Sequence, residues 1–320
     1  MSIKSKILLS GATGFVGESL LSLLSDETHV VGRTKPIYPC VFFNLDMLNN
    51  PDYSDALSNV EVVIHSAART HMMNKKFSTI QEQLDEYQKI NNYATIAFAK
   101  QASLMGVKRF IFISSIKVHG ESTNTLRKFT SVDKHAPEDF YGKSKSEAEV
   151  QLQALGNKTG MEIVIIRPTL VYGPGVKANF ASLMNLVYKG VPLPFGCITQ
   201  NKRSLVSVVN LVDLIITCID HPKAANQVFL VSDDHDVSTS EMVREMAKAL
   251  GKPAWQLPIP IWCYKLVGKL FNKSDVVDRL TGSLQVDISH TKNILGWKPP
   301  QTLQEGFKQT AQAFLQAKTK

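Results

Sequence analysis

The chain has 320 residues, of which 44% are hydrophobic and 20% are charged, as in ordinary soluble proteins. This composition excludes a disordered chain, a collagen-like chain and a coiled coil, and the length predicts one large domain or two small ones. The net charge of +8 favours an anionic partner, but no lysine or arginine block exceeds two residues, which argues against nucleic-acid binding. The cysteines are widely separated with no C-x-x-C pair, so we expect reduced thiols and no metal site: Cys40, Cys197, Cys218 and Cys263.

The N-terminal residues do not resemble a signal peptide, because the apolar run at Ile7–Leu9 is short and no small-residue cleavage site follows it. No stretch approaches the roughly 20 apolar residues of a membrane-spanning helix. We therefore expect a cytoplasmic protein with no integral membrane association. The segment Ile259–Phe271 is apolar with lysines at helical spacing, and we expect it to pack in the core or between subunits rather than on a membrane surface.

Short β-branched runs alternate with helical segments along the first half of the chain. Strands are predicted at Ile7–Leu9, Val30–Val31, Val41–Phe43, Val62–His65, Arg109–Ser114 and Ile163–Arg167. Helices are predicted at Phe15–Leu24, Asp52–Leu57, Thr79–Met105 and Tyr141–Leu155, with Gly106 and Gly156 as helix ends. This alternation predicts an α/β fold with a Rossmann-type, doubly wound parallel sheet.

Beyond Pro168 the chain becomes rich in glycine and proline, which predicts a smaller, mixed C-terminal lobe that binds the substrate. We assign residues 1–172 to the dinucleotide-binding domain, and residues 173–202 and 233–320 to the substrate lobe. Residues 203–218 and 226–232 are expected to return to the first domain. There, Leu205–Val209 and Val228–Val231 would extend the sheet.

A glycine-rich loop, GATGFVG at Gly11–Gly17, directly follows the first predicted strand and opens a helix. In such a loop the first glycine permits a tight turn, the second lets the backbone approach a pyrophosphate, and the third lets the helix pack on the strand. The helix N-terminus offers unpaired N–H groups to the anion. The residues predicted to bind a dinucleotide are therefore Gly11, Thr13, Gly14, Phe15, Val16 and Gly17.

The end of the second predicted strand lacks the acidic residue that binds the ribose of NAD in dinucleotide-binding folds. Gly32 and Arg33 occupy this place. A guanidinium can bind a 2′-phosphate bidentately, so Arg33 favours NADP(H), although the same side chain could stack on adenine or face solvent. Asp46 follows the third strand, where it could accept a hydrogen bond from the adenine amino group or form a plain turn.

Tyr141 and Lys145 are four residues apart, which places them on one face of a predicted helix. A free tyrosine titrates at about 10, so proton transfer near neutrality needs the charges of Lys145 and of an oxidised nicotinamide to favour the phenolate. Ser115, at the end of the fifth strand, can hydrogen-bond the same substrate oxygen. A tyrosine–lysine pair by itself is usually an ordinary surface pair, but with the glycine loop and Ser115 it indicates a catalytic site.

These motifs resemble the extended short-chain dehydrogenase/reductases nearly end to end, as do VIHSAA at Val63–Ala68, RPTLVYGPG at Arg167–Gly175 and ILGWKP at Ile294–Pro299. Within that family the chain is similar to the nucleotide-sugar epimerases, dehydratases and 4-ketoreductases. The resemblance implies that Tyr141 is the acid/base, that Lys145 lowers its pKa and binds the nicotinamide ribose, and that Ser115 orients the substrate oxygen. It also adds to the cofactor site Met47, Ala67, Ala68, Asn91 and Pro168.

In the substrate lobe, Arg203 stands where relatives carry an arginine that binds the substrate diphosphate. Asn179 and Phe180 stand where relatives contact the sugar nucleotide, and Arg279 is a second candidate cation for the diphosphate. The expected partner is therefore a UDP-sugar.

The chain departs from the family pattern at Gly32-Arg33, His119, Ser207 and Asn210. These departures leave the serine, tyrosine and lysine intact, but they do not favour any particular sugar. We expect His65 and His119 to be structural, because a tyrosine already supplies the proton-transfer group.

The resemblance implies hydride transfer at C4 of a UDP-activated hexose with NAD or NADP(H). A UDP-hexose 4-epimerase is the leading hypothesis, and Arg33 favours the alternative of an NADPH-dependent reductase of a UDP-4-keto-6-deoxy sugar. A dehydratase fits less well, since Ile116-Lys117 replaces the acid pair of such relatives. A third hypothesis, a non-catalytic dinucleotide-sensing module, would be expected to lack the tyrosine–lysine pair. The helices predicted at Thr79–Met105 and Tyr141–Leu155 could form a homodimer interface as in relatives, or simply pack against the sheet.

Overall fold

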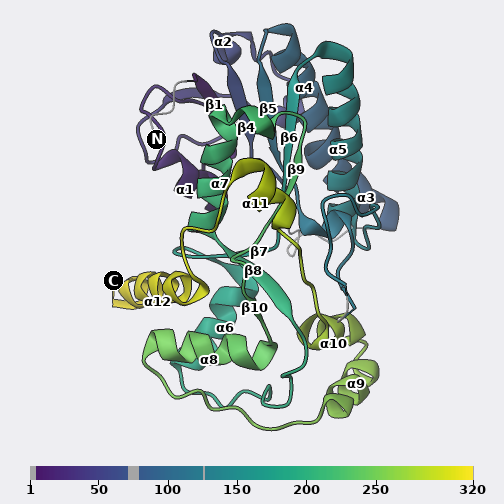
Figure 1. Ribbon diagram of the computed structural model, residues 1–320, viewed down its shortest axis with the longest axis vertical. Helices are drawn as coiled ribbons and strands as arrows, with labels where there is room; N and C mark the ends of the chain where they lie inside the picture. The colour runs from purple at the N-terminus through teal and green to yellow at the C-terminus, as the bar shows by residue number, and fades with distance from the viewer. Residues whose placement is uncertain (1–4, 71–78, 125–126, 320) are drawn as a thin grey trace.

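The structure is a computed structural model that describes residues 5–70, 79–124 and 127–319. A seven-stranded parallel sheet, ordered β3-β2-β1-β4-β5-β6-β9, forms the centre of the upper lobe in Figure 1. Its strands are β1 (Ile7–Ser10), β2 (His29–Gly32), β3 (Val41–Asn44), β4 (Val62–His65), β5 (Arg109–Ile113), β6 (Glu162–Pro168) and β9 (Val228–Val231). The predicted Rossmann-type sheet is confirmed, and it contains all the strands predicted in the first half of the chain.

Helices cover both faces of this sheet, which is why its central strands are continuous apolar runs rather than alternating ones. One face packs against α1 (Phe15–Leu21) and α7 (Val208–Asp220), in a core that also takes in Trp297. The other face packs against α2 (Ser54–Leu57), α4 (Thr95–Leu104) and α5 (Phe140–Thr159).

The helix predicted at Thr79–Met105 is present but contains an irregularity. It consists of α3 (Ile80–Gln88), a π-helical turn at Lys89–Ala94, and α4. The hydroxyl of Thr79 caps the N-terminus, and Gly106, at a φ of +81°, follows the C-terminus as expected. The π-helical turn was not predicted, because apolar spacing does not distinguish it from an α-helical turn.

The prediction that α5 ends at Gly156 is wrong. The helix continues to Thr159 and is terminated by Gly160, which has a φ of +79°. Gly156 instead allows close packing, because a Cβ there would lie 2.6 Å from Cγ1 of Ile163 on β6. The glycine therefore serves the approach of helix to strand, not the end of the helix.

The lower lobe is built on a three-stranded sheet ordered β10-β8-β7 (Figure 1). It comprises β7 (Leu170–Tyr172), β8 (Arg203–Ser207) and β10 (Asp236–Val237), packed with α6 (Ala178–Tyr188), α8 (Thr239–Leu250) and α12 (Leu303–Thr319). Val228–Val231 extends the large sheet as predicted, but Leu205–Val209 does not. The chain leaves the large sheet after β6. The next strand, β7, pairs with β8, so β8 belongs to the small sheet.

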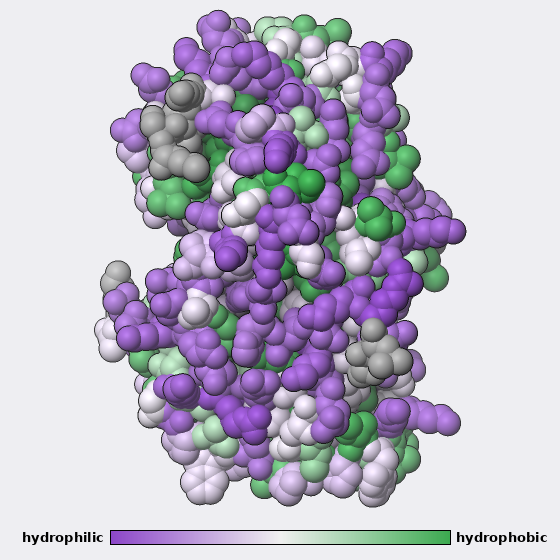
Figure 2. All heavy atoms as spheres, viewed as in Figure 1, coloured by the Kyte–Doolittle hydropathy of each residue, from purple (hydrophilic) through white to green (hydrophobic). Residues whose placement is uncertain are grey.

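Three further helices follow in the chain: α9 (Ile261–Leu270), α10 (Ser274–Thr281) and α11 (Ser289–Leu295). Figure 1 places α9 and α10 at the outer side of the lower lobe. Of the two expectations for Ile259–Phe271, packing in the core is wrong, since most of its large apolar side chains are exposed, and hydrophobic residues reach the surface there in Figure 2. Packing between subunits stays a prediction. Within the described ranges, no helix is both long enough and apolar enough to cross a membrane.

Candidate active site

The predicted catalytic and cofactor residues gather at the carboxyl ends of the parallel strands, where open α/β sheets bind ligands. The glycine loop follows β1, Ala67 follows β4, and Ser115 follows β5. The sheet register pairs Ser10 with His65, so the loops after β1 and β4 start side by side.

The glycine loop is packed so tightly that two of its positions exclude any side chain. Gly11 has a φ of +79°, and a Cβ there would lie 2.5 Å from the backbone nitrogen of Ala67. At Gly17 a Cβ would lie 2.1 Å from the carbonyl oxygen of Gly11. The predicted tight turn and close helix–strand packing are both present.

Gly17→Ala is therefore expected to lower the free energy of unfolding by several kcal/mol, or to prevent folding, because the new methyl group would displace backbone atoms. Gly32→Ala is the matched control, since the nearest atom to its new Cβ lies at 4.0 Å. Urea unfolding followed by circular dichroism measures both variants. Equal stability of the two would contradict the packing argument.

The start of α1 is suited to an anionic cofactor. Gly14 is the N-cap residue and provides no side-chain acceptor for the N–H groups of the first turn, which leaves donors for a pyrophosphate. Arg33 is exposed directly after β2, with no carboxylate at the strand end. The Asp46 carboxylate accepts a hydrogen bond from the Leu48 nitrogen at 3.1 Å and so caps a short 3₁₀ turn.

The other predicted cofactor residues differ in what the structure leaves open to a ligand. The backbone of Ala67 lies against Gly11, Ala68 is exposed, Met47 packs partly on the core, and Pro168 ends β6. Asn91 lies in the π-helical turn and is fully buried. Its side-chain oxygen accepts a hydrogen bond from the backbone nitrogen of Arg69, in the loop after β4. Its side-chain nitrogen donates to the carbonyl oxygen of Arg69 and to the Ser144 hydroxyl on α5. In this structure the polar atoms of Asn91 thus join three segments beneath the site.

The proposed catalytic residues lie together at the N-terminal end of α5. Tyr141 is hydrogen-bonded to the Ser115 side chain. Lys145, one turn further along the helix, is fully buried, donates to the carbonyl oxygen of Ile113 at 2.9 Å, and lies 4.2 Å from the Phe112 ring centroid. The Tyr141 phenol and the Ser115 hydroxyl are thus arranged to contact one oxygen atom of a substrate, and the Lys145 amine lies one helical turn further along α5.

Burial governs the pKa values of this group. Desolvation and the nearby Asp139 charge raise the pKa of Tyr141, and the hydrogen bond from Ser115 only partly offsets them. Desolvation lowers the pKa of Lys145 to about 7, although the Glu149 charge opposes it. The protein alone therefore keeps Tyr141 as a neutral phenol, which is the acid form of the predicted acid/base.

A buried charged network supports the site from behind, and the sequence analysis did not identify it. The Glu149 carboxylate lies fully buried and accepts hydrogen bonds from the Arg167 guanidinium and the Ser114 hydroxyl. Burial alone would raise the pKa of Glu149, but bonds from His135, Arg167 and Ser114 and the Arg167 charge lower it to about 2. The spacing of Glu149, four residues after Lys145, was the available signal.

His65 and His119 make contacts that fit the structural role expected of them. His65 is fully buried, with Nδ1 2.6 Å from the Ser10 hydroxyl and Nε2 2.9 Å from the Thr95 hydroxyl. His119 bonds Arg167 at 2.7 Å. Desolvation lowers the pKa of His65 to about 3 and that of His119 to about 4, so both are neutral at pH 7.

These two histidines are expected to make the protein acid-sensitive. In the unfolded chain a histidine titrates at about 6.5. Between that value and the folded pKa the unfolded state binds more protons, so stability falls as the pH falls through this window. In His65→Gln the slope of unfolding free energy against pH should decrease by up to about 1.4 kcal/mol per pH unit. Chemical unfolding from pH 7.5 to 5 measures the slope, and an unchanged slope in His65→Gln would contradict the assignment.

The two arginines predicted to bind a diphosphate lie next to each other in the lower lobe. Arg203 Nη1 donates to the carbonyl oxygen of Arg279 at 2.9 Å. The Arg279 Nε lies 3.3 Å from a carboxylate oxygen of Glu121, which also pairs with Lys117 at 2.7 Å. Glu121 belongs to the segment after Ser115, so this ion pair joins the two lobes at the side of the site.

The remaining substrate candidates stand at the start of α6. Asn179 is exposed. The Phe180 ring is buried in the core of the lower lobe and stacks on Tyr172 with centroids 5.5 Å apart, so the ring is not open to a ligand. Ala178 has a φ of +57°, an unusual value for a non-glycine residue, at the turn that leads into this helix.

Known proteins resemble this chain in both sequence and structure. The sequence profile of the NAD dependent epimerase/dehydratase family matches residues 7–232. A UDP-glucose 4-epimerase from Vibrio cholerae is 64% identical over 317 residues, which cover 97% of this chain and 96% of that protein. An N-acetyl-alpha-D-glucosaminyl-diphospho-ditrans,octacis-undecaprenol 4-epimerase from Escherichia coli O157:H7 is 28% identical over 336 residues, covering 99% and 97% of the two chains. The solved structure of MoeE5 in complex with UDP-glucose and NAD has a TM-score of 0.78 at 22% identity, covering 98% and 99%.

Proposed function

The chain belongs to the NAD dependent epimerase/dehydratase family, and we propose that it is a UDP-hexose 4-epimerase that acts on a sugar of the UDP-glucose type. The observation that carries this proposal is the 64% identity to a UDP-glucose 4-epimerase over nearly the whole of both chains. The hydrogen bond between Tyr141 and Ser115 supports it, because it places an acid/base and a positioning hydroxyl at one oxygen site.

In this mechanism, Tyr141 accepts the proton of the C4 hydroxyl and later returns it. Ser115 donates to or accepts from the same oxygen and holds it against the phenol. Lys145 binds the nicotinamide ribose, and its charge favours the phenolate once the cofactor is in place. When bound, a nicotinamide dinucleotide supplies reversible hydride acceptance at C4, and the glycine loop with the first turn of α1 would hold its pyrophosphate.

The preference between NAD and NADP is the finer part of this proposal. Arg33 favours NADP(H), since its guanidinium is exposed after β2 and could bind a 2′-phosphate. A preference for NADP(H) would fit the alternative function, an NADPH-dependent reductase of a UDP-4-keto-6-deoxy sugar, which uses the same Ser115, Tyr141 and Lys145.

One experiment tests both the reaction and the cofactor. The protein is purified without added cofactor and incubated with UDP-glucose or UDP-galactose, and the two sugars are separated by anion-exchange chromatography. A second sample is denatured, and the released dinucleotide is identified by mass spectrometry. Interconversion with near-stoichiometric NAD supports the epimerase. No interconversion, together with NADPH oxidation on a UDP-4-keto-6-deoxy sugar, would replace it with the reductase.

The diphosphate of the substrate is assigned to Arg203 and Arg279, which the structure brings within hydrogen-bond distance of each other. Asn179 and the backbone of Phe180 are assigned to the sugar-nucleotide side of the same site. We further propose a cytoplasmic homodimer that uses α4 and α5, where Leu104 and Val150 are 86% and 56% exposed. Light scattering coupled to gel filtration tests the dimer.

A further inference from the structure

The helix α9 displays an unusual group of exposed apolar side chains. Trp262, Leu266 and Leu270 recur every fourth residue and form one stripe, and Val267 and Phe271 continue the apolar surface around the helix. These five residues, called the α9 patch, are 53–77% exposed. Burying them would be favourable by roughly 1.5–3 kcal/mol per large side chain, so a surface of this kind marks an interaction site.

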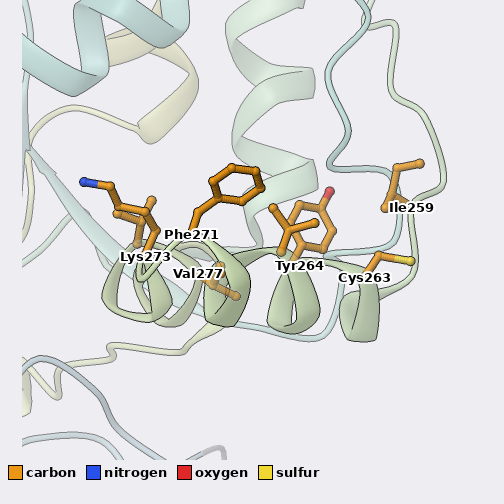
Figure 3. Close-up of a pocket in the computed structure, with 9 residues that line it drawn as sticks. Ile259, Cys263, Tyr264, Phe271, Lys273 and Val277 are labelled. Carbon is orange, nitrogen blue, oxygen red and sulfur yellow. The ribbon is translucent and has the colours of Figure 1, made fainter.

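The α9 patch adjoins an apolar groove and is held on a rigid support. The groove, of about 380 Å³, runs between α9 and α10 and is lined by Ile259, Tyr264 and Phe271 among others (Figure 3). Below it the two helices touch closely, since a Cβ at Gly268 would lie 2.6 Å from a methyl carbon of Val277. The helix pair therefore presents the patch in a fixed orientation.

Positive charge predominates in the segment that carries this apolar surface. Residues 252–281, which include α10, contain four lysines and one arginine against two aspartates: Lys252, Lys265, Lys269, Lys273, Arg279, Asp275 and Asp278. Lys265 and Lys269 lie one helical turn apart, on the stripe adjacent to that of Trp262 and Leu266. An amphipathic helix with large apolar residues on one side and lysines beside them is typical of helices that lie in a membrane interface.

The lysines distinguish a lipid surface from a second copy of this chain. A two-fold dimer would bring the same patch of both subunits together, so two copies of a segment with five cations and only two aspartates would approach each other. An anionic bilayer instead attracts each lysine near its surface and accepts the apolar side chains among its acyl chains. Trp262 and Trp255, 66% and 61% exposed, are of the residue type enriched at membrane–water boundaries.

We propose that α9 is a membrane-docking helix that binds the protein reversibly to the surface of an anionic phospholipid bilayer. This docking is independent of the catalytic residues and does not rest on the proposed function. It is peripheral, because the helix lies on the outside of the lobe and in the boundary region rather than across the bilayer.

The test is co-sedimentation of the full-length protein with phospholipid vesicles. One preparation is phosphatidylcholine alone, and the other is equal parts phosphatidylcholine and phosphatidylglycerol. The wild-type protein is expected to bind the anionic vesicles and to be released by high salt. The double variant Leu266→Asp/Leu270→Asp is expected to lose at least about tenfold in affinity, because two apolar side chains no longer enter the bilayer. Lys265→Glu/Lys269→Glu should lose binding to the anionic vesicles as well.

The matched control is Leu23→Asp/Ile37→Asp, which changes two apolar residues that are 63% and 80% exposed in the upper lobe. It should bind as the wild type does, and all variants should keep wild-type circular dichroism and thermal unfolding. A blue shift of tryptophan fluorescence on vesicle addition, lost in Trp262→Ser, is the second measurement. Absence of wild-type binding to anionic vesicles would overturn the proposal, as would equal binding by the Leu266→Asp/Leu270→Asp variant. A dimer that this variant dissociates, without vesicle binding by the wild type, would assign the patch to a second copy.

Discussion

Replacing Tyr141 with phenylalanine is expected to lower kcat about 10²- to 10⁴-fold, the usual contribution of a positioned acid/base. The phenylalanine ring keeps the shape of the side chain but cannot exchange a proton with the sugar oxygen. The hydrogen bond to Ser115 is also lost. Affinity for the UDP-sugar should stay within about twofold, since it is assigned to Arg203 and Arg279 in the other lobe.

Stopped-time assays of UDP-sugar turnover and calorimetry of UDP binding measure the two effects separately. Tyr93→Phe is the matched control, because its ring is 62% exposed in the π-helical turn and lies outside the proposed machinery. Its rate should equal that of the wild type. An unaffected rate in Tyr141→Phe would exclude both the epimerase and the reductase mechanisms, because both use this phenol.

Glu149→Gln is expected to be the most destabilising isosteric change in the upper lobe. The variant leaves the Arg167 guanidinium, which is buried, without its carboxylate partner. Removing one partner of a buried ion pair typically costs about 3–5 kcal/mol. In the folded wild type, hydrogen bonds and the Arg167 charge hold the pKa of Glu149 at about 2. The ionised carboxylate therefore stabilises the fold above its unfolded pKa of about 4.5, and this stabilisation is lost as the pH falls toward 2.

The same variant should also change the active site. The Glu149 charge raises the pKa of Lys145 against the effect of burial, so its removal should lower that pKa further below about 7. The limb of the kcat–pH profile that reports the lysine should move to lower pH. Glu147→Gln is the control on the same helix, since its carboxylate accepts from the neutral Gln88 amide at 2.8 Å. A stability loss below about 1 kcal/mol in Glu149→Gln would contradict the buried-pair argument.

The sequence predicts the large sheet well because its signals are local. Each buried parallel strand is a short apolar run. The tight turn after the first strand excludes side chains at Gly11 and Gly17, and the spacing of these two glycines is visible in the sequence. Tyr141 and Lys145 were likewise found from spacing on a single helix. For the same reason the ends of elements were less certain, as Gly156 illustrates, since a glycine also serves close packing.

Features that depend on distant parts of the chain were not predictable. Glu149 and Arg167 resemble ordinary surface charges until the fold brings them together in the core. β8 has the pattern of a strand but no signal that selects the small sheet over the large one. The apolar residues of α9 suggested burial, because a single sequence does not reveal that they stay exposed in the part of the fold that the structure describes. The resemblance to a known family assigned Asn91 to the cofactor site, but it did not predict the hydrogen bonds by which Asn91 joins three segments.

The position of β9 and α7 in the chain affects how a newly made protein can fold. β1 leaves the ribosome before the other strands of the large sheet, yet the hydrophobic core that it joins also contains Leu211 and Ile215 of α7, Phe229 of β9 and Trp297. A nascent chain that has emerged only as far as β6 therefore exposes the part of this sheet face that α7 and Trp297 later cover. The upper lobe can become stable only late in translation, after most of the lower lobe has been synthesised.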